Sequence, residues 1–173
     1  MQFLNTPARY GLVARLAHWT SVTLVGWLFL GISGLDVPPK VHARDAVVAN
    51  HAAVGLALLA LMTLRFAWRR SNPNPVLRYR LAPWHRALVL GVHRSLYLLV
   101  AAECTLGLAA LAAAGAAVPV VGTIMAPDDA LAGAARAWHD GVATALLLLV
   151  AVHASSAVVN QIVAGGEAPA PRP

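Results

Sequence analysis

The stretch that decides the fold is residues 137–164, which read AWHDGVATALLLLVAVHASSAVVNQIVA. This run is longer than the roughly 20 apolar residues that a helix needs to cross the hydrocarbon core of a bilayer. Asp140 is its only Asp, Glu, Lys or Arg, and His139 and His153 are its two histidines. The sequence therefore predicts a membrane-spanning helix that carries two histidines.

Three earlier stretches have the same apolar character, and Gly and Pro mark the segments between them, as in Asn72-Pro73-Asn74-Pro75. No strand-like alternation of polar and apolar residues competes with helix. We predict an all-α protein, an integral membrane four-helix bundle, with helices over about residues 10–35, 46–69, 84–114 and 136–164. Residues 1–164 then form one transmembrane domain, and the Pro-rich tail, residues 165–173, is expected to be disordered.

The composition favours a membrane protein as well. Of the 173 residues, 59% are apolar and 12% are charged, which is typical of helical membrane proteins. The net charge of +6 does not indicate a nucleic-acid partner, because arginines cluster beside apolar runs, as at Arg69 and Arg70. Cys104 is the only cysteine, so an intrachain disulfide is excluded. The lipid bilayer is therefore the expected partner.

The distribution of Lys and Arg predicts the orientation, because cytoplasmic loops of membrane proteins are enriched in both. Nine of them flank the spans on the side of the two termini: Arg9, Arg15, Arg65, Arg69, Arg70, Arg78, Arg80, Arg86 and Arg172. Three fall on the opposite side: Lys40, Arg44 and Arg136. We therefore expect both termini and the second loop to be cytoplasmic.

Four of the seven histidines fall at matching depths in this topology. His139 and His153 are 14 residues apart on the fourth helix, a rise of about 21 Å and a rotation about 40° short of four whole turns. They point the same way, one near each membrane face. His51 lies near the outer start of the second helix, and His18 lies near the cytoplasmic start of the first. We therefore pair His51 with His139 and His18 with His153.

Paired imidazoles suit haem iron, because two of them fill both axial positions and favour electron transfer over dioxygen binding. The sequence contains no Cys-x-x-Cys-His motif, so any haem is expected to be noncovalent, b-type. Two pairs predict two haem b groups, whose iron is bound by these four histidines, and a transmembrane electron path.

Two other interpretations of the histidines remain open. Each histidine could simply hydrogen-bond a neighbouring helix. A His-lined transition-metal transporter is the other coherent alternative. Such a transporter usually places carboxylates with the histidines near the middle of the membrane. Glu103 is the only acidic residue deep in a predicted span.

The motifs around these histidines resemble those of the bacterial cytochrome b561 family. The resemblance covers about residues 9–160. It rests on Arg15-Leu16-Ala17-His18-Trp19 in the first helix, His51, Gly55, Arg65 and Arg69 in the second, Pro73-Asn74-Pro75 in the loop, His93, Tyr97 and Gly107 in the third helix, and Trp138-His139 and His153 in the fourth. Cys104 stands where several members of that family have a proline.

The resemblance implies a di-haem, multi-pass protein of the bacterial inner membrane with His18, His51, His139 and His153 as axial ligands. It also implies electron exchange between the quinone pool and a second donor or acceptor. In some members the donor is superoxide, which would make the chain a superoxide:ubiquinone oxidoreductase. The alternative is a cytochrome b membrane anchor that relays electrons from a dehydrogenase or hydrogenase partner protein.

Further residues are expected near the haems. His93 and Arg94, in the third helix, are interpreted as contacts to a quinone or to a haem propionate. Guanidinium groups bind carboxylates through two hydrogen bonds, so four arginines are expected as propionate partners: Arg15, Arg65, Arg69 and Arg136. The positive-inside rule explains most of these arginines equally well.

Overall fold

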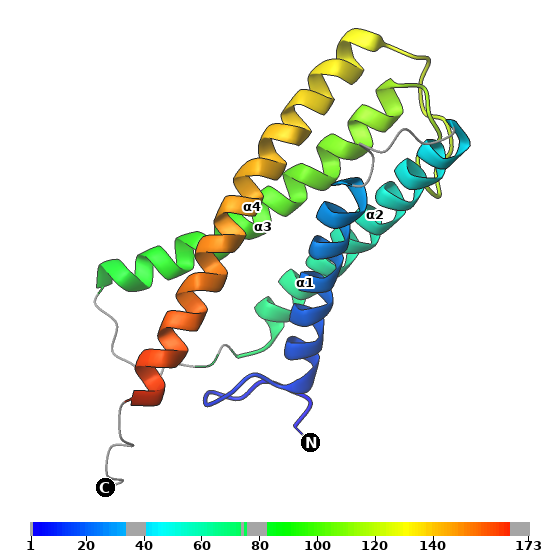
Figure 1. The fold of residues 1–173 in the computed structure, drawn as a ribbon. Helices are drawn as coiled ribbons and strands as arrows, with labels where there is room; N and C mark the ends of the chain where they lie inside the picture. Colours follow the sequence, from blue (N-terminus) through cyan, green and yellow to red (C-terminus); the bar gives the residue numbers. More distant parts are fainter. Residues whose placement is uncertain (1, 34–40, 74, 76–82, 167–173) are drawn as a thin grey trace, which may run out of the picture.

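The chain folds into four long helices that run side by side in alternating directions (Figure 1). The computed structural model describes residues 2–33, 41–73, 75 and 83–166. The helices are α1 (Leu12–Ser33), α2 (Val41–Ser71), α3 (Pro83–Ala113) and α4 (Asp129–Gly166). No strand occurs among the described residues, apart from an isolated bridge between Val118 and Gly122. The prediction of an all-α four-helix bundle is confirmed.

The expected helix ranges of about 46–69 and 136–164 lie inside α2 and α4, which both begin several residues earlier. The expected tail, residues 165–173, lies outside the described part of the chain from residue 167 onward. The start of α1 and the end of α4 lie at the same end of the bundle (Figure 1). The structure contains no bilayer, so the cytoplasmic location of that end remains a prediction.

Each helix contains a segment long and apolar enough to cross a membrane, namely Leu12–Gly31, Ala46–Ser71, Arg86–Ala113 and Asp129–Val159. Large apolar side chains lie on the outside of the bundle, such as Leu30, which is 78% exposed, and Leu98, which is 71% exposed. Apolar surface of this extent is unfavourable in water, at about 25 cal/mol per Å², and lipid acyl chains would cover it. The protein is therefore a multi-pass membrane protein.

Local signals define several helix ends. Pro83 is the first residue of α3, a position where its fixed φ and missing N–H are tolerated. The Leu131 N–H donates to Asp128 Oδ1 at 3.0 Å, which caps the start of α4. Arg69 and Arg70 lie in the last turn of α2, where cations favourably oppose the negative end of the helix dipole.

The helices pack in sequence order, and the fourth is set apart from the first two. Among the described residues, extensive interfaces join α1 to α2, α2 to α3 and α3 to α4, whereas α4 has no comparable interface with α1 or α2. A small core is formed by Leu58, Val100, Cys104 and Leu146. No large side chain among the described residues is completely buried. The described part of the bundle therefore has only a small buried core, and α4 packs mainly against α3.

Cys104 links α3 to α2 at the middle of the bundle. Its buried Sγ–H donates to the backbone carbonyl of Gly55 at 3.4 Å. A proline at this position, as in several members of the resembled family, would remove a backbone N–H from α3 and bend the helix. With cysteine the α3 ladder continues through this position.

Candidate haem sites

The structure brings the four predicted histidines together in the two predicted pairs. The rings of His18 on α1 and His153 on α4 have centroids 6.4 Å apart, and those of His51 on α2 and His139 on α4 lie 6.1 Å apart. Each of the four side chains is partly buried. Both pairs therefore bring α4 next to the α1–α2 pair.

These separations fit the spacing of two imidazoles bound to one metal. A metal–imidazole bond is roughly 2 Å long, so two such bonds plus half of each ring place the ring centres about 6 Å apart. The rings of the two pairs are nearly perpendicular, at 76° and 82°, and their separations of 6.4 Å and 6.1 Å also lie within the range of direct edge-to-face ring contact. The residues present therefore fit bis-histidine haem, at two levels about 21 Å apart along α4.

Two residues of α3, Glu103 and Gly107, determine how the His139 ring packs against this helix. Its Nδ1–H lies 3.0 Å from the backbone carbonyl oxygen of Glu103 and 3.2 Å from Glu103 Oε1. A Cβ at Gly107 would lie 2.9 Å from Cε1 of the ring, so glycine is required for this approach. Because a backbone carbonyl can only accept, Nδ1 carries the proton and the Nε2 lone pair is free for a metal.

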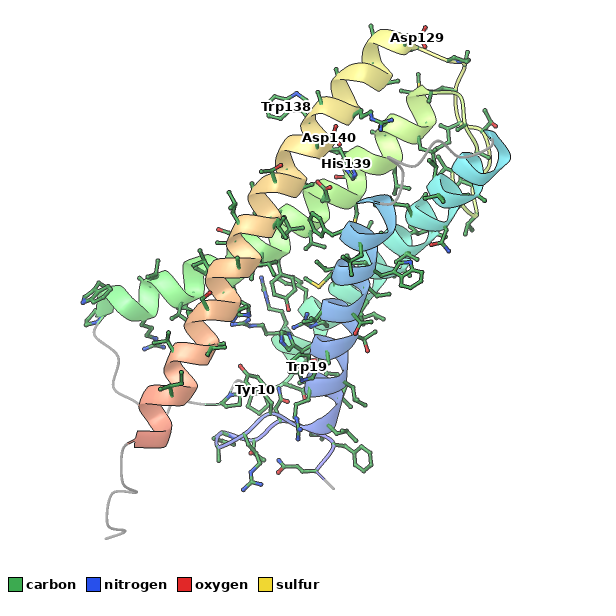
Figure 2. All side chains as sticks on the ribbon, viewed as in Figure 1. Tyr10, Trp19, Asp129, Trp138, His139 and Asp140 are labelled. Atoms are coloured by element: carbon green, nitrogen blue, oxygen red, sulfur yellow. The ribbon has the colours of Figure 1, made fainter. Side chains whose placement is uncertain are left out.

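Adjacent residues on α4 point to opposite sides of the helix. Trp138 is 69% exposed, and Figure 2 shows it projecting from α4 away from the bundle, while His139 lies between α4 and α3. Trp138 therefore faces lipid, as expected for an interfacial tryptophan.

His18 has a different neighbour at Nδ1. Arg65 Nη2 lies 3.2 Å from this atom, and Arg65 Nη1 donates to Ser21 Oγ at 3.0 Å. A guanidinium can only donate, so Nδ1 of His18 accepts and a neutral ring carries its proton on Nε2. Binding of iron by Nε2 would therefore require the guanidinium to move away from Nδ1.

His93 lies beside the His18/His153 pair. Its ring centroid is 5.0 Å from that of His153, and its Nδ1–H donates to the backbone carbonyl of Val89 at 2.7 Å. The Nε2 atom of His93 is then a hydrogen-bond acceptor. His93 thus belongs to the same end of the bundle as the His18/His153 pair.

The arginines predicted to lie near the haems differ in their burial. Arg65 is half-buried and contacts a proposed ligand, and Arg69 is half-buried on the next turn of α2. Arg15, Arg94 and Arg136 are exposed. Contacts of these arginines with propionates remain predictions.

Four residues near the sites were not predicted from the sequence: Ser21, Met62, Asn50 and Trp27. Ser21, 5% exposed, and Met62 both contact the Arg65 guanidinium. At the other end, Asn50 Oδ1 accepts from Trp27 Nε1 at 3.2 Å. Asn50 and Trp27 also line, with His51, a shallow cavity of about 270 Å³. The signals in the sequence were weak: Ser21 lies one turn after His18, and Asn50 directly precedes His51.

No group of three or more His, Cys, Asp or Glu side chains within the described part of the chain is arranged to hold a metal ion. The rings of His18, His93 and His153 lie together at one end of the bundle, and those of His51 and His139 lie at the other.

Four membrane-spanning helices with histidine rings near one another at two levels are typical of membrane-bound haem proteins. The family model of prokaryotic cytochrome b561 matches residues 9–166. The chain is also 27% identical over 169 residues to cytochrome b561 homolog 2 of Escherichia coli (strain K12), covering 94% of this chain and 90% of the relative. The chain belongs to the prokaryotic cytochrome b561 family. It is a multi-pass bacterial membrane protein that binds haem b and transfers electrons, and the resemblance noted from its motifs is confirmed.

Proposed function

We propose that the chain holds two haem b groups, one between His18 and His153 and one between His51 and His139, in the bacterial inner membrane. The observation that carries this proposal is the pair of ring separations, 6.4 Å and 6.1 Å. Electrons pass along α4 between the two levels and connect the quinone pool with a second donor or acceptor.

When bound, haem b supplies a one-electron redox centre whose potential depends on its ligands and their hydrogen bonds. The chain's own residues bind and orient this group. The four imidazoles would bind the iron at each level and would exclude dioxygen and water from it. Glu103 fixes the tautomer of His139, and Arg65 places a cation at the level of His18.

His93 is the proposed quinone contact. Because its Nδ1–H is bound to Val89 O, its Nε2 accepts a hydrogen bond and suits the hydroxyl of a quinol. The orientation with both termini in the cytoplasm places this site on the inner side. Superoxide, which would make the chain a superoxide:ubiquinone oxidoreductase, and a reduced partner protein are the two donors to test at the other side.

The test of haem binding is a reduced-minus-oxidised visible spectrum with pyridine haemochrome quantification on detergent-purified protein. We expect two low-spin b haems per chain in the wild type and one in His153→Ala. His85→Ala, which changes a histidine outside both pairs, is the control and should retain two. Purified protein without haem would reject the proposal, and bound transition metal without porphyrin would point to a transporter.

A further inference from the structure

The loop between α3 and α4, residues 114–128, is apolar although it lies outside both helices. It reads AGAAVPVVGTIMAPD, and Thr123 is its only polar side chain before Asp128. Four large apolar side chains of this loop, called the apolar tip below, are exposed: Val120 at 97%, Val121 at 68%, Ile124 at 58% and Met125 at 37%. An exposed apolar cluster of this kind is typical of a surface that contacts a protein or a lipid phase.

Hydrogen bonds within the backbone hold the turn that presents the tip. Val118 and Gly122 exchange two N–H to carbonyl hydrogen bonds, at 3.0 Å and 2.9 Å, and the Val121 N–H donates to the Val118 carbonyl at 3.2 Å. Pro119 has no N–H, so Val120 has the only N–H of this turn without a backbone partner among the described residues. Internal satisfaction of backbone donors is what hydrocarbon requires of any segment that enters it.

Val120 has an unusual backbone conformation for its residue type. Its φ is 72°, in the left-handed region that β-branched residues rarely adopt. A conformation of this kind costs about 1–3 kcal/mol, and glycine or asparagine would adopt it more easily. A valine exposed to water gains nothing that offsets this cost. Contact with an apolar phase would offset it, at about 25 cal/mol per Å² of apolar surface.

The two ends of the loop lie close together, and the loop doubles back along the bundle. The Asp128 N–H donates to the Ala113 carbonyl at 2.8 Å, and a Cβ at Gly115 would lie 2.6 Å from Pro127 Cγ. Figure 1 shows the loop, in yellow-green, running back from the end of α3 toward the start of α2. The loop therefore turns toward the membrane-spanning part of the bundle and not away from it.

The lengths of α4 and of the loop allow the tip to reach the bilayer. Trp138, the exposed interfacial tryptophan of α4, lies nine residues after the first residue of the helix, Asp129. At 1.5 Å per residue, α4 therefore begins about 13 Å beyond the membrane interface. The five residues from Gly115 to Val120 span about 16 Å when extended. A loop that doubles back can thus bring its tip to the level of Trp138.

We propose that the apolar tip inserts into the lipid leaflet at the His51/His139 end of the bundle, where acyl chains cover it. Residues 114–128 contain no Lys or Arg, so the loop lacks the charges that bind anionic headgroups. Its apolar side chains suit the acyl chains beneath the headgroups instead. The inserted tip fixes the ends of α3 and α4 at the membrane surface, and this role does not depend on haem.

The experiment measures the depth of spin labels on the full chain in vesicles of phosphatidylcholine and phosphatidylglycerol. Val120→Cys, Ile124→Cys or Asp129→Cys is made in the Cys104→Ala background and labelled with a nitroxide. Electron paramagnetic resonance compares label collisions with oxygen, which concentrates in the bilayer, and with a water-soluble nickel chelate. We expect the oxygen-to-nickel ratio to be several-fold higher at positions 120 and 124 than at Asp129, the exposed control at the start of α4 (Figure 2).

A negative charge in the tip should withdraw it from the membrane. Val121→Asp should lower the ratio at position 124 several-fold, because a carboxylate is costly among acyl chains. Ala130→Asp, which adds the same charge at the exposed start of α4, should leave that ratio unchanged. The proposal is overturned if the labels at 120 and 124 collide mainly with the nickel chelate, which would place the tip in water. Shielding of both labels from both reagents would also overturn it, because the tip would then pack against a partner protein or a second copy of the chain.

Discussion

The two ends of this bundle carry the same pair of imidazole side chains, but the neighbours of these rings differ. At the His51/His139 end, the Glu103 carbonyl and the bare Cα of Gly107 hold the His139 ring with Nε2 free. At the His18/His153 end, Arg65 occupies Nδ1 of His18, and the third ring of His93 lies 5.0 Å from His153. At the first end, the contacts of His139 fix the orientation of its ring. At the second end, His93 adds a group next to the proposed haem ligands that can exchange a proton.

The sharpest test of this difference is removal of His93. We expect His93→Phe to lower the rate of haem reduction by a ubiquinol analogue about a hundred-fold, because a positioned proton acceptor contributes on the order of 10²–10⁴. Haem content and dithionite reduction should stay at wild-type levels. The measurement is stopped-flow absorbance after mixing with the quinol.

The control for that prediction lies at the other end. Asn50→Ala removes a polar group that lines the cavity beside His51 and should leave the quinol reaction unchanged. A loss of quinol reactivity in Asn50→Ala, with normal kinetics in His93→Phe, would move the quinone to the His51/His139 end.

A second, smaller effect is expected from a change at Gly107, which packs against the His139 ring. Gly107→Ala places a methyl group 2.9 Å from Cε1 of the ring, and overpacking of this kind costs about 1–3 kcal/mol. The His51/His139 haem should dissociate about ten-fold faster, and the other haem should be unaffected. The measurement is haem transfer to an excess of apomyoglobin, followed by absorbance, with two resolved phases.

Gly91→Ala is the matched control on the same helix. A Cβ at Gly91 meets no atom within 4 Å among the described residues, and alanine favours helix by about 1 kcal/mol over glycine. Haem loss from both sites should keep its wild-type rate in this variant. If haem loss were equally faster in Gly91→Ala and Gly107→Ala, general changes in the helix, and not the contact of Gly107 with His139, would control haem retention.

Spacing along one helix was sufficient to predict which histidines lie near each other. His139 and His153 fall on one face of α4 because 14 residues are close to four turns, and the depth of each span placed His51 and His18 opposite them. The four helices followed from apolar runs longer than the bilayer core. The binding of iron between the paired rings remains a prediction.

The contacts that distinguish the two ends could not be predicted in this way. The Arg65 contact with His18 depends on the rotation of α2 against α1 and on the torsions of a long side chain. The hydrogen bond from His139 to Glu103 depends on the register of α4 against α3. Hydropathy and periodicity fix neither quantity, because both are set by packing between helices distant in sequence.

The smallest effect is expected midway between the two ends, at Cys104. Cys104→Ala removes the Sγ–H bond to the Gly55 carbonyl and leaves a small gap in the core around Leu58 and Val100. Thermal unfolding monitored by circular dichroism should show a loss of about 1 kcal/mol. Because this contact belongs to neither histidine pair, haem content should remain unchanged. Loss of haem from Cys104→Ala would mean that α2–α3 packing also controls haem retention.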